Sequence, residues 1–261
     1  MTRYTTIPYT DAQVKDFAAL TETGVASARV MWEKYALSEY RPLMDAPLVG
    51  SGEKAKYKWD ASARLWVLTR TSRKIPALEM RNKAIEPFIQ NVKAYMRGLS
   101  ETLRTGKMSL LEWQSLMMQA TKDSQVAAAL IANGGARNAG QEDTDYIAIL
   151  ILLILLALVA FAADIASGGQ LLNGTILSRT DLYAEAARDA YEEMERYEAE
   201  NYLGKTQERR VLNPLANHCH TVDDFIGCPE LAARGWVKIG TLPRLMDTPC
   251  RSKCKCHFLF R

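Results

Sequence analysis

The first 217 residues of this 261-residue chain contain neither cysteine nor histidine. Each of the three histidines lies next to a cysteine in the remaining part, and the sequence has no Gly-x-Ser-x-Gly motif and no phosphate-binding glycine loop. Paired carboxylates suited to acid–base chemistry do not stand out either. Since catalysis needs an open metal position or a nucleophile beside a base, the sequence predicts a protein that is not an enzyme and has no catalytic residues.

The chain also lacks a large net charge and a secretory signal. A net charge of +3 is too small to indicate a nucleic-acid-binding protein, although residues 54–83 and the tail from 205 are basic and residues 181–200 are acidic. Such alternation of charge is typical of surfaces that contact different partners, or of ordinary solvent-exposed faces. No apolar segment follows the N-terminal residues, so we expect synthesis in a cytoplasm. In that reducing compartment, clustered cysteines are interpreted first as metal ligands and only second as disulfides.

Helical periodicity dominates the chain up to about residue 200. Apolar residues at three- and four-residue steps predict helices over 7–40, 87–106, 109–132 and 175–200. Ser109 and Glu112 have the spacing of a capping box, in which each side chain satisfies a free backbone N–H of the first turn. In the last helix we expect the acidic residues to face solvent.

The predicted fold class is mainly α: a bundle of long helices, a short β-hairpin near 57–70 and a small zinc-stapled C-terminal module. Aromatic and β-branched residues on either side of Asp60-Ala-Ser-Ala predict the hairpin. We divide the chain into a helical and hairpin region (1–86), a helical core (87–203) and a cysteine-rich module (204–261).

The segment 146–163 is apolar throughout, with only the Tyr146 hydroxyl as a polar side-chain group. Eighteen helical residues span about 27 Å, close to the thickness of a bilayer core. The flanks carry acidic residues and no nearby lysine or arginine that would anchor a span. The predicted helix is therefore buried in a bundle or an oligomer core, or it inserts into a membrane.

Five cysteines and three histidines gather in the last 44 residues. The cysteines form a first pair and a second, denser group, and all five are candidate metal ligands: Cys219, Cys228, Cys250, Cys254 and Cys256. Two short clusters joined by a turn-rich loop can supply the four tetrahedral ligands of a structural zinc ion, which fixes a segment too small to fold by apolar burial alone. Disulfides formed after release into an oxidising medium, and unliganded core thiols, are the alternatives. Basic neighbours such as Lys253 and Lys255 could also contact phosphate.

This tail resembles the cysteine-rich end of the Mu-type minor head, or head morphogenesis, proteins of tailed phages. The resemblance lies in 209–214, in His218-Cys219 with Cys228, in the Gly-Trp-Val-Lys-Ile-Gly-Thr-Leu-Pro stretch that ends at 243, and in 250–256. It extends more weakly over the preceding helices from about residue 100. In that family the position of the apolar segment is usually an amphipathic helix.

The resemblance implies a non-enzymatic virion protein located inside the capsid near the portal, where it assists head assembly or genome delivery. The implied partners are the portal or other head proteins and further copies of the chain, with weak contact to packaged DNA. The chain would be in the host cytoplasm during assembly and in the virion afterwards. The alternative is an ejection protein that inserts 146–163 into the host inner membrane during DNA delivery.

Overall fold

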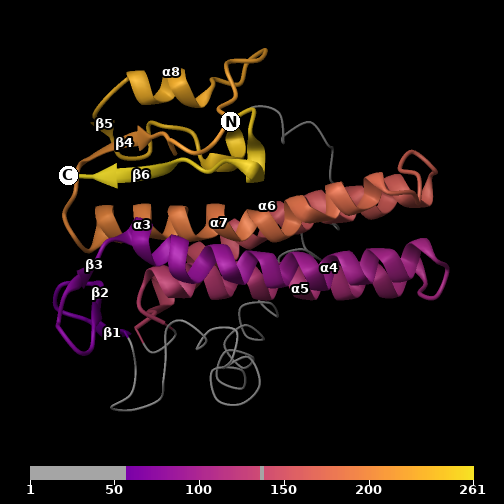
Figure 1. Cartoon of the computed structure of the whole chain (residues 1–261), viewed down its shortest axis with the longest axis horizontal. Helices are drawn as coiled ribbons and strands as arrows, with labels where there is room; N and C mark the ends of the chain where they lie inside the picture. Colours follow the sequence, from indigo (N-terminus) through magenta and orange to yellow (C-terminus); the bar gives the residue numbers. More distant parts are fainter. Residues whose placement is uncertain (1–56, 136–137) are drawn as a thin grey trace.

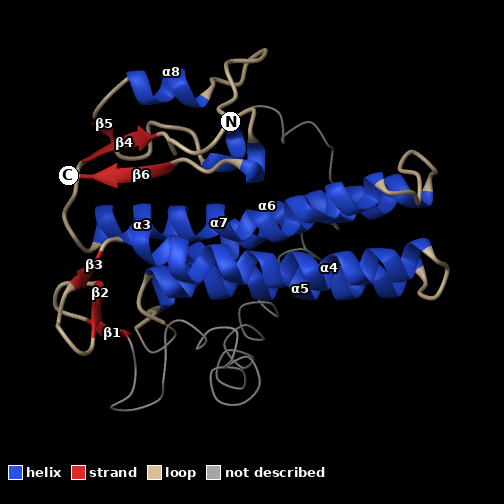
Figure 2. Cartoon of the chain, viewed as in Figure 1, coloured by secondary structure: helices blue, strands red, loops and turns tan. Residues whose placement is uncertain are grey.

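Four long helices run side by side along the molecule (Figures 1 and 2). The computed structural model describes residues 57–135 and 138–261, and within them the protein is mainly helical, with two small antiparallel sheets. The long helices are α4 (Glu86–Arg104), α5 (Leu110–Ala132), α6 (Gln141–Ala166) and α7 (Thr175–Asn201). They confirm the predicted helical class, whereas the predicted helix 7–40 lies outside the described residues.

The turn between α4 and α5 follows the signals in the sequence. Gly106 ends α4 with a φ of +72°, a conformation that glycine adopts without strain. Its N–H donates to Leu103 O at 2.9 Å. The Ser109 hydroxyl then accepts the Glu112 N–H at 3.2 Å and begins α5. Both predicted helices therefore form within a few residues of their predicted ends.

The first sheet covers one end of the bundle. The predicted hairpin is confirmed as β1 (Tyr57–Asp60) and β2 (Leu65–Leu68), and a third strand, β3 (Lys74–Ile75), extends it. A short helix, α3 (Ala77–Met80), and a π-helical turn, η2 (Arg81–Ile85), lead from the sheet into α4. Tyr57 and Ile75 are buried in the same apolar cluster as residues of the long helices, so the sheet shares the core of the bundle.

Helix α6 is longer than the apolar segment that predicted it. It begins at Gln141 because the Asp143 carboxylate accepts the Gly140 N–H at 2.7 Å and caps a first turn that precedes the apolar segment. One face is buried, including Leu158 and Phe161, whereas Ile149 and Leu153 are 59% and 44% exposed. Among the described helices, α6 alone is long and apolar enough to cross a membrane.

Helix α7 corrects the prediction that its acidic residues face solvent. Asp189, Glu192 and Glu193 are all buried. The C-terminal module lies over this face of α7, opposite the face that packs on α4 and α5, and its arginines and backbone N–H groups pair with the carboxylates (Figure 1). The acidic pattern therefore marks a contact inside the molecule.

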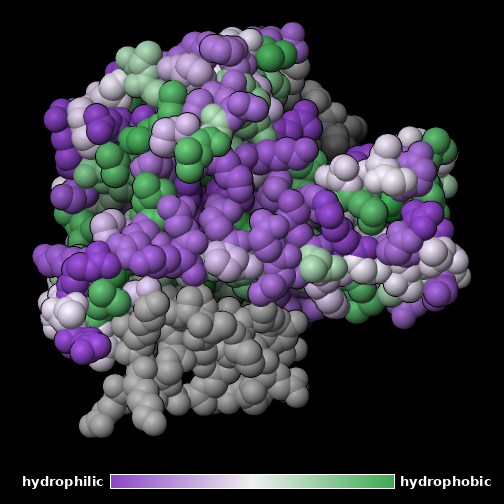
Figure 3. Space-filling model, viewed as in Figure 1, coloured by the Kyte–Doolittle hydropathy of each residue, from purple (hydrophilic) through white to green (hydrophobic). Residues whose placement is uncertain are grey.

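The C-terminal module is built on a second three-stranded sheet in the order β5-β4-β6, with ranges Val237–Lys238, Gln207–Val211 and His257–Phe260. Its remaining elements are α8 (Cys228–Ala233) and the 3₁₀ turns η3 (Leu245–Asp247) and η4 (Arg251–Lys253). On the face shown in Figure 3, hydrophilic side chains dominate the middle of the molecule, while hydrophobic ones are scattered over the module.

Gly134 provides a test of how the first sheet is fastened to the bundle. A Cβ at Gly134 would lie 2.1 Å from the Trp59 ring, whereas a Cβ at Gly135 would meet nothing within 4 Å, and both residues have positive φ. Gly134→Ala and Gly135→Ala therefore share a backbone cost of about 1 kcal/mol. We expect Gly134→Ala to lose roughly 1–3 kcal/mol more, because the indole must move. Urea unfolding measures the difference, and equal losses would contradict the packing of Trp59 on Gly134.

Candidate metal centre

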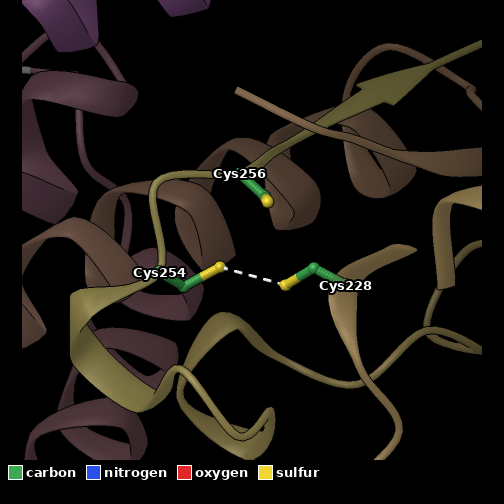
Figure 4. A group of neighbouring side chains, drawn as sticks. All are labelled: Cys228, Cys254 and Cys256. Atoms are coloured by element: carbon green, nitrogen blue, oxygen red, sulfur yellow. Dashed lines mark hydrogen bonds between the residues drawn. The ribbon is translucent and has the colours of Figure 1, made fainter. Parts of the chain in front are cut away.

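Three cysteine side chains of the C-terminal module lie close together. Cys228 is the first residue of α8, Cys254 follows η4, and Cys256 directly precedes β6. Their sulfur atoms all lie within 4.8 Å of one another, and Cys228 Sγ and Cys254 Sγ are 3.5 Å apart. All three residues are buried, and Figure 4 shows their side chains pointing into one common space. The structure therefore brings together three of the five predicted ligands.

His218 lies at the edge of this thiol group. Its Nδ1 is 3.6 Å from Cys256 Sγ. The two other histidines are placed differently: His220 contacts Glu230 at the exposed surface, and His257 is buried in β6, where burial lowers its pKa to about 4. Sequence reasoning did not select His218 as a ligand, although its position beside Cys219 offered the signal.

Cys219 and Cys250, the remaining two predicted ligands, form a separate contact. The Cys219 N–H donates to Cys250 Sγ at 3.4 Å, and both residues are half-buried. Burial raises the pKa of Cys250 to about 12, and a hydrogen bond with the Cys219 side chain contributes to the increase. Neither residue belongs to the group of three sulfurs that lie within ligand distance of one another.

Gly227 allows the chain before α8 to approach the site. A Cβ on this residue would lie 2.5 Å from Cys219 O and 2.5 Å from the carbonyl carbon of His220. The close approach lets the Cys228 N–H donate to Cys219 O at 3.0 Å. The segment that carries His218 is thus held against the start of α8, which carries Cys228.

The three thiols influence one another's titration. Hydrogen bonds with Cys228 and Cys256 lower the pKa of Cys254. The contact with Cys254 correspondingly raises the pKa of Cys228. For Cys256, a hydrogen bond with Cys228 lowers the pKa, but the contact with Cys254 and burial outweigh it and raise the pKa to about 11.

Two buried arginines hold the backbone that carries Cys254 and Cys256. Arg188 of α7 donates to Ser252 O at 2.7 Å, and Arg81 of η2 donates to Cys256 O at 2.7 Å and to Lys255 O at 2.8 Å. These hydrogen bonds connect residues far apart in sequence and fix the direction of the cysteine-bearing turn. Sequence reasoning missed both arginines, because nothing in their local patterns predicts a partner more than sixty residues away.

Each of these arginines is itself paired with a buried or half-buried carboxylate. Arg188 contacts Glu86 at 2.5 and 2.9 Å, and Arg81 contacts Glu192 at 2.7 Å. Burial raises the pKa of Glu86, but Arg188 and Lys255 outweigh it and bring the pKa to about 2. The carboxylates therefore keep the arginines charged and oriented towards the module.

The donor set suits a soft divalent cation. Three thiolates and one imidazole around Zn²⁺ carry a net charge of about −1, which a buried site must compensate. Arg210 is fully buried, its charge lowers the pKa of Cys254, and its Nε and Nη1 have no hydrogen-bond partner within the described part of the chain. Three sulfurs, with one imidazole beside them, are donor types found in structural zinc sites.

Comparisons with known proteins found no matching protein family, no matching curated protein and no matching solved structure.

The Glu86–Arg188 pair predicts how stability changes with pH. A carboxylate whose pKa is about 2 in the folded chain and 4.5 in the reference state stabilises the fold above pH 4.5, and this contribution disappears as the pH falls towards 2. Glu86→Gln should therefore cost about 3 kcal/mol at pH 7 and much less at pH 3. Urea unfolding with a chelator present at both pH values measures this, with Glu200→Gln, an exposed residue of α7, as the control. A cost that does not depend on pH would contradict the assignment.

Proposed function

We propose that the thiol group binds one structural zinc ion through Cys228, Cys254, Cys256 and the Nδ1 of His218. The three buried sulfurs, and the half-buried His218 whose Nδ1 lies 3.6 Å from Cys256 Sγ, support this ligand set. Zinc, when bound, supplies a fixed cross-link and no reaction. His218 replaces Cys219 and Cys250 of the set predicted from the sequence, because those two residues contact each other instead.

The cross-link would join parts of the module that have little apolar core of their own. Cys228 precedes Cys254 by 26 residues, and the apolar cluster of the module is small and includes the cysteines themselves. Small domains with so little apolar burial gain much of their stability from a metal or a disulfide. The zinc ion would therefore stabilise the tail in its docked position on α7.

Metal analysis tests this ligand set. We expect one zinc ion per chain, its loss in Cys254→Ser and weaker retention in His218→Ala, while His220→Ala, at an exposed histidine of the same segment, keeps the ion. Because zinc binds the folded state only, 1,000-fold excess over its Kd adds roughly 4 kcal/mol to the free energy of unfolding. A chain that lacks zinc and has five free thiols, or a His220→Ala variant that loses the metal, would overturn the ligand set.

For the whole chain we propose a non-enzymatic minor head protein of a tailed phage, located inside the capsid near the portal. The observation that carries this proposal is the tail pattern, with its cysteines and the Gly-Trp-Val-Lys-Ile-Gly-Thr-Leu-Pro stretch that ends at 243. The arrangement of the module supports it, because the proposed site is closed by protein ligands and fastened to a helical bundle, which suits assembly contacts. Portal or other head proteins and further copies of the chain are the proposed partners.

A second candidate is an ejection protein that inserts α6 into the host inner membrane during DNA delivery. The exposed apolar residues of α6 favour it, since Ile149 and Leu153 lie on one face of the helix that the described residues do not cover. The buried face of α6 would have to leave the bundle before the helix could cross a bilayer, which makes this candidate the more costly one.

One fractionation experiment separates the two candidates. Purified virions carrying a labelled chain are allowed to infect cells, and emptied particles are then separated from host membranes. A head protein co-purifies with the particles before and after DNA release, whereas an ejection protein moves to the membrane fraction. Absence of the chain from purified virions would overturn both candidates.

A further inference from the structure

Two of the five cysteines lie outside the proposed zinc site and face each other. Cys219 and Cys250 come from segments 31 residues apart, and the Cys219 N–H donates to Cys250 Sγ at 3.4 Å. Both are half-buried, whereas Cys228, Cys254 and Cys256 are buried. A dissolved reagent can therefore reach the pair more readily than it can reach the other three thiols.

The position of the pair in the chain is equally informative. Cys219 directly follows His218, and Cys250 is the residue from which η4 begins, four positions before Cys254. A bond between these two sulfurs would join the same two segments that the proposed zinc ion joins, because His218 lies on one of them and Cys254 on the other. All five cysteines are candidate ligands by sequence, and the structure divides them into two groups.

We propose that Cys219 and Cys250 form a reversible redox pair, which closes as a disulfide and holds the tail together independently of the metal. The proposal depends on the proposed zinc site in one respect, which is that Cys219 and Cys250 are not among its ligands. It assigns the chain a modification site that becomes occupied when protein made in a reducing cytoplasm reaches an oxidising medium.

The chemistry requires a small-molecule disulfide, such as oxidised glutathione, as the electron acceptor. One of the two sulfurs attacks as a thiolate, forms a mixed disulfide and releases one glutathione thiol. The second sulfur then attacks the protein side of this mixed disulfide, which forms the Cys219–Cys250 bond and releases the second glutathione. Two thiol protons and two electrons leave the protein, and the oxidant is reduced to two thiols.

The bond would close a loop that contains α8, β5 and η3. Closing a loop restricts the unfolded tail, and a loop of about 30 residues lies in the range in which disulfides stabilise small modules appreciably. Metal loss would then no longer release the tail from α7. Zinc would hold the module during assembly, and the disulfide would hold it after release.

Peptide mapping of the full chain tests the proposal. The protein is purified with zinc under reducing conditions, freed of reductant, incubated with oxidised glutathione and then alkylated, and zinc is measured on the same sample. We expect two of the five thiols to disappear, a single cross-linked peptide joining Cys219 to Cys250, and unchanged zinc. After chelation, proteolysis of the tail should be roughly tenfold slower in the oxidised sample than in the reduced one.

Two serine variants supply the control. Cys219→Ser and Cys250→Ser should keep their zinc, and in each the remaining thiol should carry one glutathione instead of a cross-link. A cross-link that involves Cys228, Cys254 or Cys256, glutathione on both Cys219 and Cys250 of the parent chain, or loss of zinc in Cys250→Ser would overturn the redox pair. Because the cross-link and the zinc content are read separately, absent zinc with a Cys219–Cys250 bond would reject the metal site alone.

Discussion

The contact between the charged face of α7 and the C-terminal module determines how the rest of the molecule is arranged. Asp189 pairs with Arg244 of the module, and Arg196 lies between Glu193 of the same helix and Glu208 of the module, at 3.1 and 2.8 Å. Glu192 pairs with Arg81 of η2, which in turn donates to Cys256 O of the module. Removing these charges from water costs free energy. Each charge is buried beside a partner of opposite charge, and the ion pairs and hydrogen bonds offset this cost. Burial raises the pKa of Glu192 and of Glu193 in spite of their arginine partners.

That cost also gives the interface its specificity. An apolar contact tolerates small shifts, whereas Glu192 must accept from Arg81 on one side and from the Phe258 N–H on the other, at 2.7 and 3.1 Å. The strand β6 is thereby placed in one register on α7. Since Cys256 directly precedes β6, the same hydrogen bonds position one sulfur of the candidate metal centre. The thiol group is therefore held from outside as well as by its own short loops.

The helices were predictable because their signals are local. Gly106 and Ser109 mark an end and a start, and apolar steps of three and four residues mark the faces of α4 and α5. The burial of the acidic face of α7 was not predictable, since a row of carboxylates has the same sequence pattern whether it contacts water or arginine. Strand β4 was not predicted for a related reason. Its inward-facing residues are Glu208 and Arg210, so it lacks the apolar alternation of an ordinary strand.

The candidate site was likewise predictable only in part. The gathering of cysteines in the tail predicted a metal site, but the choice among five of them depends on which loops meet in space. Cys228 joins Cys254 and Cys256, and Cys219 meets Cys250, although sequence spacing pairs Cys219 with Cys228. The contribution of His218 and the support from Arg81 and Arg188 depend on contacts across the fold, which no local pattern records.

The charged face of α7 has one more consequence, for the order in which the chain becomes structured. The four long helices precede every residue of the candidate metal centre, so the bundle can form while the tail is still unpaired. Until the module docks, Asp189 lacks Arg244 and Glu192 lacks the Phe258 N–H, so water hydrates this face of α7. Docking of the module then exchanges that water for protein partners, and an exposed surface becomes the middle layer of the protein.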